Sequence, residues 1–122
     1  MNILSEEVTA GLHLVKIEGA LTSAEAPVLI EKFKELAEQG VRRVVISLEE
    51  VPFIDSRGLA ALITGYRMFG SAAHDFRLVG LQDQSKLVFE LTGFDRIIQV
   101  YESVAEAIDQ AQAVPMSSPA PA

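Results

Sequence analysis

The spacing of apolar residues changes several times along the chain, and each change marks a new element of structure. Residues 12–18 read Leu-His-Leu-Val-Lys-Ile-Glu, which is rich in branched side chains and predicts a strand. Residues 3–8 are a candidate antiparallel partner for it, joined through a turn at 10–11. A nearly continuous apolar run at 43–48 is typical of a central strand buried on both faces. Further strands are predicted at 76–79 and 97–101.

Apolar residues at helical spacing occupy the segments between these strands. Residues 23–39 carry such a stripe, with Ser23 as the candidate N-cap and Gly40 just past the last turn. A second helix is predicted from Ser56 to about Gly70, and a fourth over 102–111. The third, over 83–91, is expected to face the core through three apolar residues, Leu87, Val88 and Leu91.

This order of elements predicts an α/β fold. Strands that alternate with helices imply parallel pairings joined by right-handed crossovers, and the opening strand pair adds an antiparallel element. We therefore expect a mixed, mostly parallel sheet with four helices mainly on one face. With 122 residues the chain is long enough for one domain, which we place at 1–111. The remaining segment, 112–122, is rich in Ala, Pro and Ser and is predicted to be disordered.

Composition excludes several classes of function. The net charge of −7 argues against nucleic acid and anionic membranes as partners. No apolar run approaches the roughly 20 residues that cross a bilayer, and no secretory signal is visible, so a cytoplasmic location without membrane insertion is expected. There is no cysteine, the two histidines lie far apart, and no phosphate-binding glycine loop occurs. We therefore predict no metal, no cofactor and no enzyme activity.

One stretch, residues 51–59, is not explained by packing alone. A buried-strand pattern runs into a loop, and a helix then opens with Asp-Ser-Arg-Gly at 55–58. Asp55 or Ser56 can cap this helix, and Gly58 indicates that something approaches its first turn closely. Two interpretations remain open at this point: an ordinary helix cap, or a binding site at the positive end of the helix.

Three segments of the chain together resemble one known family. Residues 53–59 (Phe-Ile-Asp-Ser-Arg-Gly-Leu) resemble the Asp-Ser-Ser/Thr-Gly-Leu signature of STAS-domain anti-sigma-factor antagonists. Residues 19–22 and 26–29 resemble the family's Gly-Glu-Ile/Leu-Asp turn and its following Ala-Pro helix start. Residues 89–98 resemble its Phe-x-x-Thr/Ser-Gly-Leu segment. The resemblance extends from about residue 1 to 111.

The resemblance implies a regulatory switch built on protein binding. It implies that Ser56 is the phosphoacceptor, that the unphosphorylated form binds an anti-sigma factor acting as a serine kinase, and that a serine phosphatase resets the switch. The binding of the anti-sigma factor releases the sigma factor for transcription. The expected partner-binding residues lie in two loops and the helix start: Leu21, Thr22, Ser23, Phe53, Asp55, Ser56, Arg57, Gly58 and Leu59.

Two positions depart from the family pattern. Arg57 stands where the best-known members carry Ser or Thr, and it can either pair with a phosphate on Ser56 or simply face solvent. Thr22 stands where many phosphorylated members carry Asp. These departures keep two alternatives open: an adaptor or scaffold that is never phosphorylated, for example in a transport complex, and a sensor for a small ligand such as a nucleotide or lipid.

Overall fold

The elements follow the predicted order along the chain. A computed structural model describes residues 2–9, 11–70 and 76–113. In chain order the elements are β1 (Asn2–Thr9), β2 (Leu12–Glu18), α1 (Ala26–Glu38), β3 (Arg43–Glu50), α2 (Ser56–Phe69), β4 (Phe76–Val79), α3 (Asp83–Thr92), the 3-10 helix η1 (Phe94–Arg96), β5 (Gln99–Tyr101) and α4 (Val104–Ala113). The helix α4 therefore extends two residues past the expected domain boundary. Residues 114–122 lie outside the described residues, so the disorder of the tail stays a prediction.

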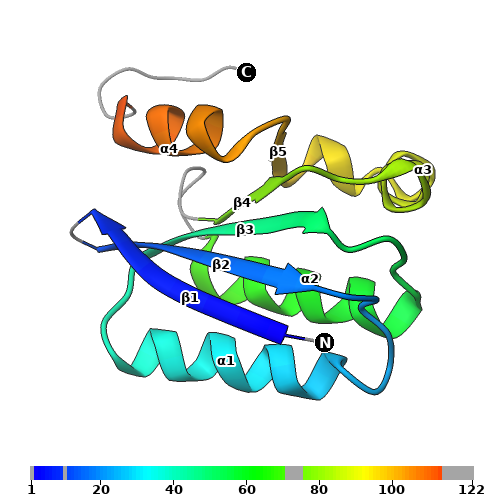
Figure 1. Ribbon diagram of the computed structural model, residues 1–122, viewed down its shortest axis with the longest axis horizontal. Helices are drawn as coiled ribbons and strands as arrows, with labels where there is room; N and C mark the ends of the chain where they lie inside the picture. Colours follow the sequence, from blue (N-terminus) through cyan, green and yellow to red (C-terminus); the bar gives the residue numbers. More distant parts are fainter. Residues whose placement is uncertain (1, 10, 71–75, 114–122) are drawn as a thin grey trace.

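The five strands form one sheet in the order β1-β2-β3-β4-β5 (Figure 1). β1 pairs antiparallel with β2, and the three other pairings are parallel. Because each parallel strand is laid down beside the one before it, right-handed crossovers place the connecting helices on the same face. The α/β fold with a mixed sheet and four helices is confirmed, including the antiparallel strand pair at the start.

The two faces of the sheet carry cores of different size. Twenty of the described residues form a large buried cluster between the sheet and the connecting helices, and α1, α2 and α3 all contribute to it. The other face carries a small cluster, in which Ala107 of α4 packs on Leu12, Val45 and Val79. Figure 1 shows α4 on the side of the sheet opposite to α1 and α2. The helices thus lie mainly on one face, as the sequence predicts.

Three aromatic rings join α1, α2 and β4 in the large core. Phe33 of α1 is fully buried, and its ring meets Phe69 and Phe76 edge-on at centroid distances of 6.1 and 5.9 Å. Edge-to-face contacts of this kind add stability beyond the buried area. They pack α1 against the last residue of α2 and against β4, and so help to keep the two helices side by side.

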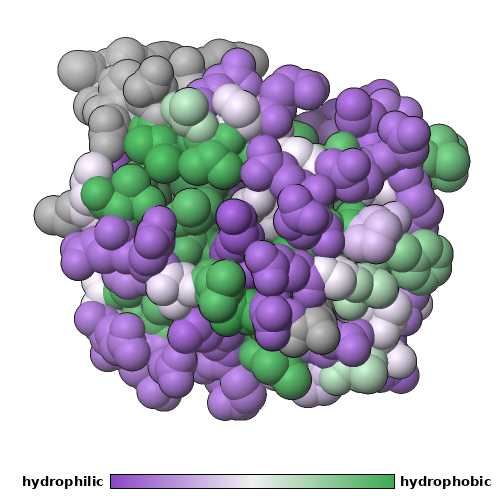
Figure 2. All heavy atoms as spheres, viewed as in Figure 1, coloured by the Kyte–Doolittle hydropathy of each residue, from purple (hydrophilic) through white to green (hydrophobic). Residues whose placement is uncertain are grey.

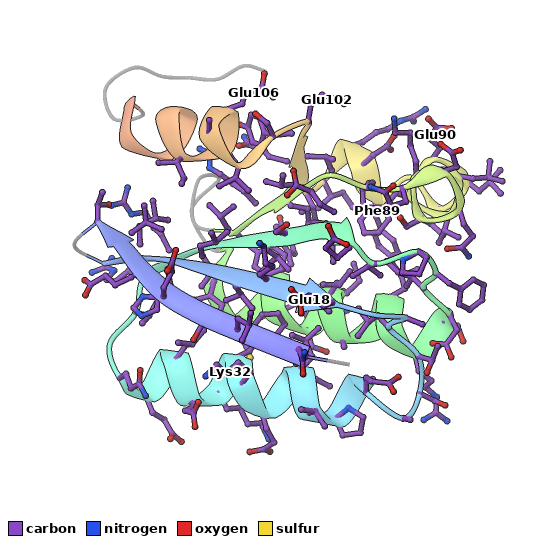
Figure 3. The ribbon with its side chains drawn as sticks, in the orientation of Figure 1. Glu18, Lys32, Phe89, Glu90, Glu102 and Glu106 are labelled. Carbon is purple, nitrogen blue, oxygen red and sulfur yellow. The ribbon has the colours of Figure 1, made fainter. Side chains whose placement is uncertain are left out.

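The predicted orientation of α3 is wrong. Leu87 and Leu91 are 54% and 78% exposed, whereas Phe89 and Ser85 are buried. Figure 3 shows Phe89 on the side of α3 that faces the sheet and Glu90 on the outward side. The helix turns Phe89 inward because that one aromatic ring reaches the large core, and the two leucines then lie on the opposite surface. No helix among the described residues is long and apolar enough to cross a bilayer.

Candidate functional site

The loops that follow β2 and β3 meet beside the N-terminus of α2. Backbone hydrogen bonds join them: the Gly19 N–H donates to the Glu50 carbonyl at 2.9 Å, and the Leu21 N–H donates to the Phe53 carbonyl at 2.9 Å. Leu21 also forms a parallel bridge with Ile54. Parallel pairing between the two chain segments thus continues beyond the regular strands. It brings the two loops predicted as a binding surface into direct contact.

The Asp55 carboxylate holds both loops at once. The residue is extended, with φ −97° and ψ −177°, and one carboxylate oxygen accepts the Gly58 N–H at 2.8 Å as the N-cap of α2. The other oxygen accepts the Ser23 N–H at 3.0 Å, across 32 positions of sequence. Of the two candidate caps in the sequence, Asp55 is therefore the cap. Its side chain has a structural task in addition to any contact with a partner.

Gly58 allows the first turn of α2 to lie against the neighbouring loop. A Cβ atom at this position would stand 2.2 Å from the Leu21 carbonyl oxygen and 2.9 Å from the Leu21 carbonyl carbon. Backbone atoms cannot move aside as the end of a side chain can, so only glycine fits. The close approach indicated by the sequence is thus made by the chain's own backbone.

A second carboxylate folds back on the loop that begins at Leu21. The Thr22 hydroxyl donates to Glu25 Oε1 at 2.6 Å, and the Thr22 N–H donates to the same oxygen at 3.2 Å. The hydrogen bonds from the Thr22 hydroxyl and backbone lower the pKa of the Glu25 carboxyl below its ordinary value. Residue 22 is not itself an acid, but the Glu25 carboxylate therefore lies against it in the same loop.

Two residues of this region were not predicted from the sequence. Glu25, rather than Ser23, is the N-cap position of α1, so the predicted Ser23 cap is wrong. The sequence carried a signal for the contact between Glu25 and Thr22, because Thr-x-x-Glu ahead of an apolar stripe is the pattern of a capping box, in which the Glu side chain accepts the Thr N–H. That pattern alone would place the cap at Thr22 rather than at Glu25. Gln84 of α3 donates to the Ile54 carbonyl and accepts the Ile54 N–H, both at 3.0 Å. No local sequence pattern predicts that contact.

The remaining predicted residues differ in what they offer at the surface. Ser56 is the first residue of α2, and it is exposed together with Arg57. The Phe53 ring, 45% exposed, belongs to the same loop. Leu21 and Gly58 are buried, so they set the shape of the loops rather than present side chains, and Leu59 is half-buried against the large core. The surface itself thus consists of a hydroxyl, a guanidinium and an aromatic ring around a helix N-terminus.

The arrangement suits the binding of an anion or a protein surface. The first turn of α2 contains no acidic residue, and the N–H groups of a first turn lack partners within their own helix. The Asp55 carboxylate accepts the Gly58 N–H of this turn, and Ser56, the first residue of the helix, lies at the positive end of the helix dipole. Among the residues that the structure describes, no group of three His, Cys, Asp or Glu side chains is placed to hold a metal ion.

Comparison with known proteins gives consistent relatives. A model of the STAS domain family matches residues 5–107. The anti-sigma-B factor antagonist of Bacillus subtilis is 34% identical over 86 residues, which cover 70% of this chain and 78% of that protein.

Solved structures resemble the fold over nearly the whole chain. An anti-sigma factor antagonist from Mycobacterium paratuberculosis matches with a TM-score of 0.80 at 24% identity, covering 91% of this chain and 93% of the other. The Bacillus cell fate determinant SpoIIAA, in its phosphorylated form, matches with a TM-score of 0.71 at 21% identity, covering 89% and 98%. At these identities the two structures establish the shared fold.

Proposed function

The chain belongs to the STAS domain proteins of the non-enzymatic anti-sigma factor antagonist family, and on this premise we propose that it is a partner switch controlled at Ser56. In its unphosphorylated form it binds an anti-sigma factor that is itself a serine kinase, and so frees a sigma factor for transcription. Phosphorylation of Ser56 breaks this complex, and a serine phosphatase restores it. We place these events in the cytoplasm.

The observation that carries this proposal is the position of Ser56. It is an exposed first residue of a helix whose cap, Asp55, is already engaged by two N–H groups. A phosphate on Ser56 would add about 1.5 to 2 negative charges where the helix N-terminus favours an anion. The modified protein therefore keeps its fold, and the switch acts on the surface rather than on stability.

The contact surface combines the N-terminal end of α2 with the loop at 21–24. The exposed Phe53 ring supplies an apolar anchor, because aromatic residues contribute strongly at the centre of protein interfaces. A phosphate beside this ring would have to lose its water when a partner docks, which is strongly unfavourable. Charge and bulk on Ser56 thus weaken binding without moving the loops.

The departures at Thr22 and Arg57 are compatible with a phosphorylated site. Glu25 returns a carboxylate to the Thr22 turn, where an acid is otherwise missing. Arg57 is exposed next to Ser56, so its guanidinium can pair with a phosphate at this position. The charges of the loop and of the first helical turn therefore do not argue against a kinase substrate.

Intact-mass spectrometry of protein purified from its native host tests the proposal. We expect wild type to carry a phosphate-sized increment, Ser56→Ala to lack it, and the matched control Ser23→Ala to keep it. Ser23 is a suitable control because it is an exposed serine in the adjoining loop, and its backbone rather than its side chain binds Asp55. If wild type carries no increment under any growth condition, Ser56 is not the switch.

Binding completes the test. Immobilised wild type should retain the host's anti-sigma factor kinase, and Ser56→Asp should lose it. Ser103→Asp should retain the kinase, because Ser103 is an exposed serine just before α4, outside the proposed contact surface, and aspartate can cap that helix as serine does. Equal retention by wild type and Ser56→Asp would contradict the proposed contact surface. Retention of a transporter ATPase by both proteins, together with the absence of phosphate, would instead favour the constitutive adaptor suggested by Thr22 and Arg57.

A further inference from the structure

The outer side of β1 is an open edge of the sheet. β1 stands first in the strand order, and within the described part of the chain no strand pairs with its other side. Backbone N–H and C=O groups along such an edge can hydrogen-bond to an added strand. Glu6, Glu7 and a register shift between Glu7 and Thr9 protect one half of this edge. The other half, residues 2–5, carries no charge, proline or glycine.

A hollow lies on each face of the sheet beside this edge. On the α1 side, a hollow of about 470 Å³ is lined by Ile3 of β1 and by α1 residues that include Val28 and Lys32. Figure 3 shows Lys32 between α1 and β1. On the α4 side, a hollow of about 170 Å³ is lined by residues that include Leu4 and Leu14. The edge strand thus separates two recesses that open on opposite faces.

The two recesses match the geometry of an added strand. Successive side chains of a strand point to opposite faces, so a strand paired with β1 would direct alternate side chains toward one hollow and then the other. Each hollow offers an apolar contact at its border, because Val28 and Leu4 are 55% and 53% exposed. Figure 2 shows apolar surface gathered between β1 and α4, on the side of the smaller hollow.

We propose that β1 is a second docking site, which binds an extended, basic segment of a partner protein as a sixth strand of the sheet. Pairing with backbone groups provides register, and apolar side chains at adjacent positions of the segment enter the two hollows. The α1-side hollow is lined by three glutamates and two lysines, and the protein as a whole carries −7, so a basic segment is favoured over an acidic one. A second copy is disfavoured, because a parallel pairing would place Glu6 and Glu7 opposite the same residues, and in any pairing each copy carries −7.

Two synthetic peptides test this site. The basic probe is acetyl-Lys-Ile-Val-Leu-Thr-Lys-amide, and the acidic probe replaces both lysines with glutamate. Amide signals of uniformly ¹⁵N-labelled full-length protein are followed during titration. We expect the basic peptide to shift signals of β1 residues with a Kd below about 1 mM, and the acidic peptide to bind at least about tenfold more weakly.

Matched variants locate the site. Leu4→Lys should weaken the basic peptide about tenfold or more, whereas Leu91→Lys, the same change at another exposed leucine, should leave the Kd unchanged. Thermal melting of both variants checks that they remain folded. The proposal is overturned if neither peptide binds, if both bind equally, or if Leu4→Lys has no effect. It is also overturned if sedimentation shows a wild-type dimer that Leu4→Lys dissociates, since the occupant would then be a second copy.

Discussion

The starts of α1 and α2 both lie near the carboxyl ends of the strands that precede them, β2 and β3. They are nevertheless held in different ways. At α2, the extended Asp55 caps the helix and also binds the Ser23 N–H from the other loop. At α1, Glu25 has helical dihedral angles and makes no side-chain cap bond, and its carboxylate bonds only to Thr22, three residues earlier. One start is fixed by contacts across the chain and the other by a single local turn.

This difference explains how the proposed switch can be both exposed and rigid. The loop at 21–24 takes its position from Asp55 and from backbone bonds to the 51–55 segment, rather than from the helix that follows it. Ser56 directly follows Asp55, the residue that makes this hydrogen bond. A partner that binds at Ser56 therefore also contacts the adjoining loop, whose conformation is already fixed. Less conformational entropy is then lost on binding.

Among the variants that test this difference between the two helix starts, Gly58→Ala should lower the stability of the protein most. The new methyl group would collide with the Leu21 backbone, and we expect a net loss of about 1–3 kcal/mol of unfolding free energy despite the better helix propensity of alanine. Urea denaturation measures the loss. Amide spectra should show shifts in both loops, because the close approach of α2 to Leu21 is disturbed.

Gly65→Ala is the matched control for that change. Its added methyl would meet the Phe33 ring in the core rather than a loop backbone. It should also destabilise the protein, but the amide signals of Leu21 and Ser23 should stay in place. If the two variants perturb the same signals equally, Gly58 has no special part in shaping the site.

Asp55→Ala should have the next largest effect. Loss of an N-cap side chain lowers stability by about 0.5–2 kcal/mol, and here it also releases the Ser23 N–H. Hydrogen exchange at Ser23 should therefore accelerate together with exchange at Gly58. Asp83→Ala, at an exposed aspartate in the first turn of α3, removes only a favourable helix-dipole charge of about 0.3–1 kcal/mol. Unchanged exchange at Ser23 in Asp55→Ala would disprove the long-range tie.

Gln84→Ala tests the second long-range contact near the start of α2. The side-chain amide exchanges two hydrogen bonds with the Ile54 backbone, so its removal should destabilise the protein by about 1–2 kcal/mol. The measurement is the shift of the urea midpoint, with Lys86→Ala, at an exposed residue of the same helix, as the comparison. Equal midpoints for the two variants would mean that the Ile54 contact adds nothing.

The smallest effect is expected in the local turn at α1. Carbon-detected NMR titration should give Glu25 a pKa below its ordinary value, and Thr22→Val should raise it by removing the hydroxyl donor. Because folding lowers this pKa, the ionised carboxylate stabilises the fold above the unfolded pKa, and this contribution is lost as the pH falls through the folded value. An unchanged pKa in Thr22→Val would mean that the hydroxyl does not hold the carboxylate.

Local patterns predicted most elements of the fold. The bounds of β2 and the start of α2 are confirmed. Both signals, a run of branched residues and an Asp-Ser helix start, lie within a few consecutive residues. The inward face of α3 was predicted wrongly, because in so short a helix Leu87 and Leu91 also form an apolar stripe. Only the position of α3 over the sheet decides that Phe89 enters the core.

The sequence by itself determined the α/β fold, the order of its elements and the place of Ser56 at the start of a helix, because spacing and capping act over a few neighbouring residues. The tertiary structure decided what Asp55, Gly58 and Gln84 contact, since each of these residues meets a segment distant along the chain. It also decided that the edge of β1 lies between two hollows. These features depend on how separate segments are brought together, and such contacts leave no fixed spacing in the sequence.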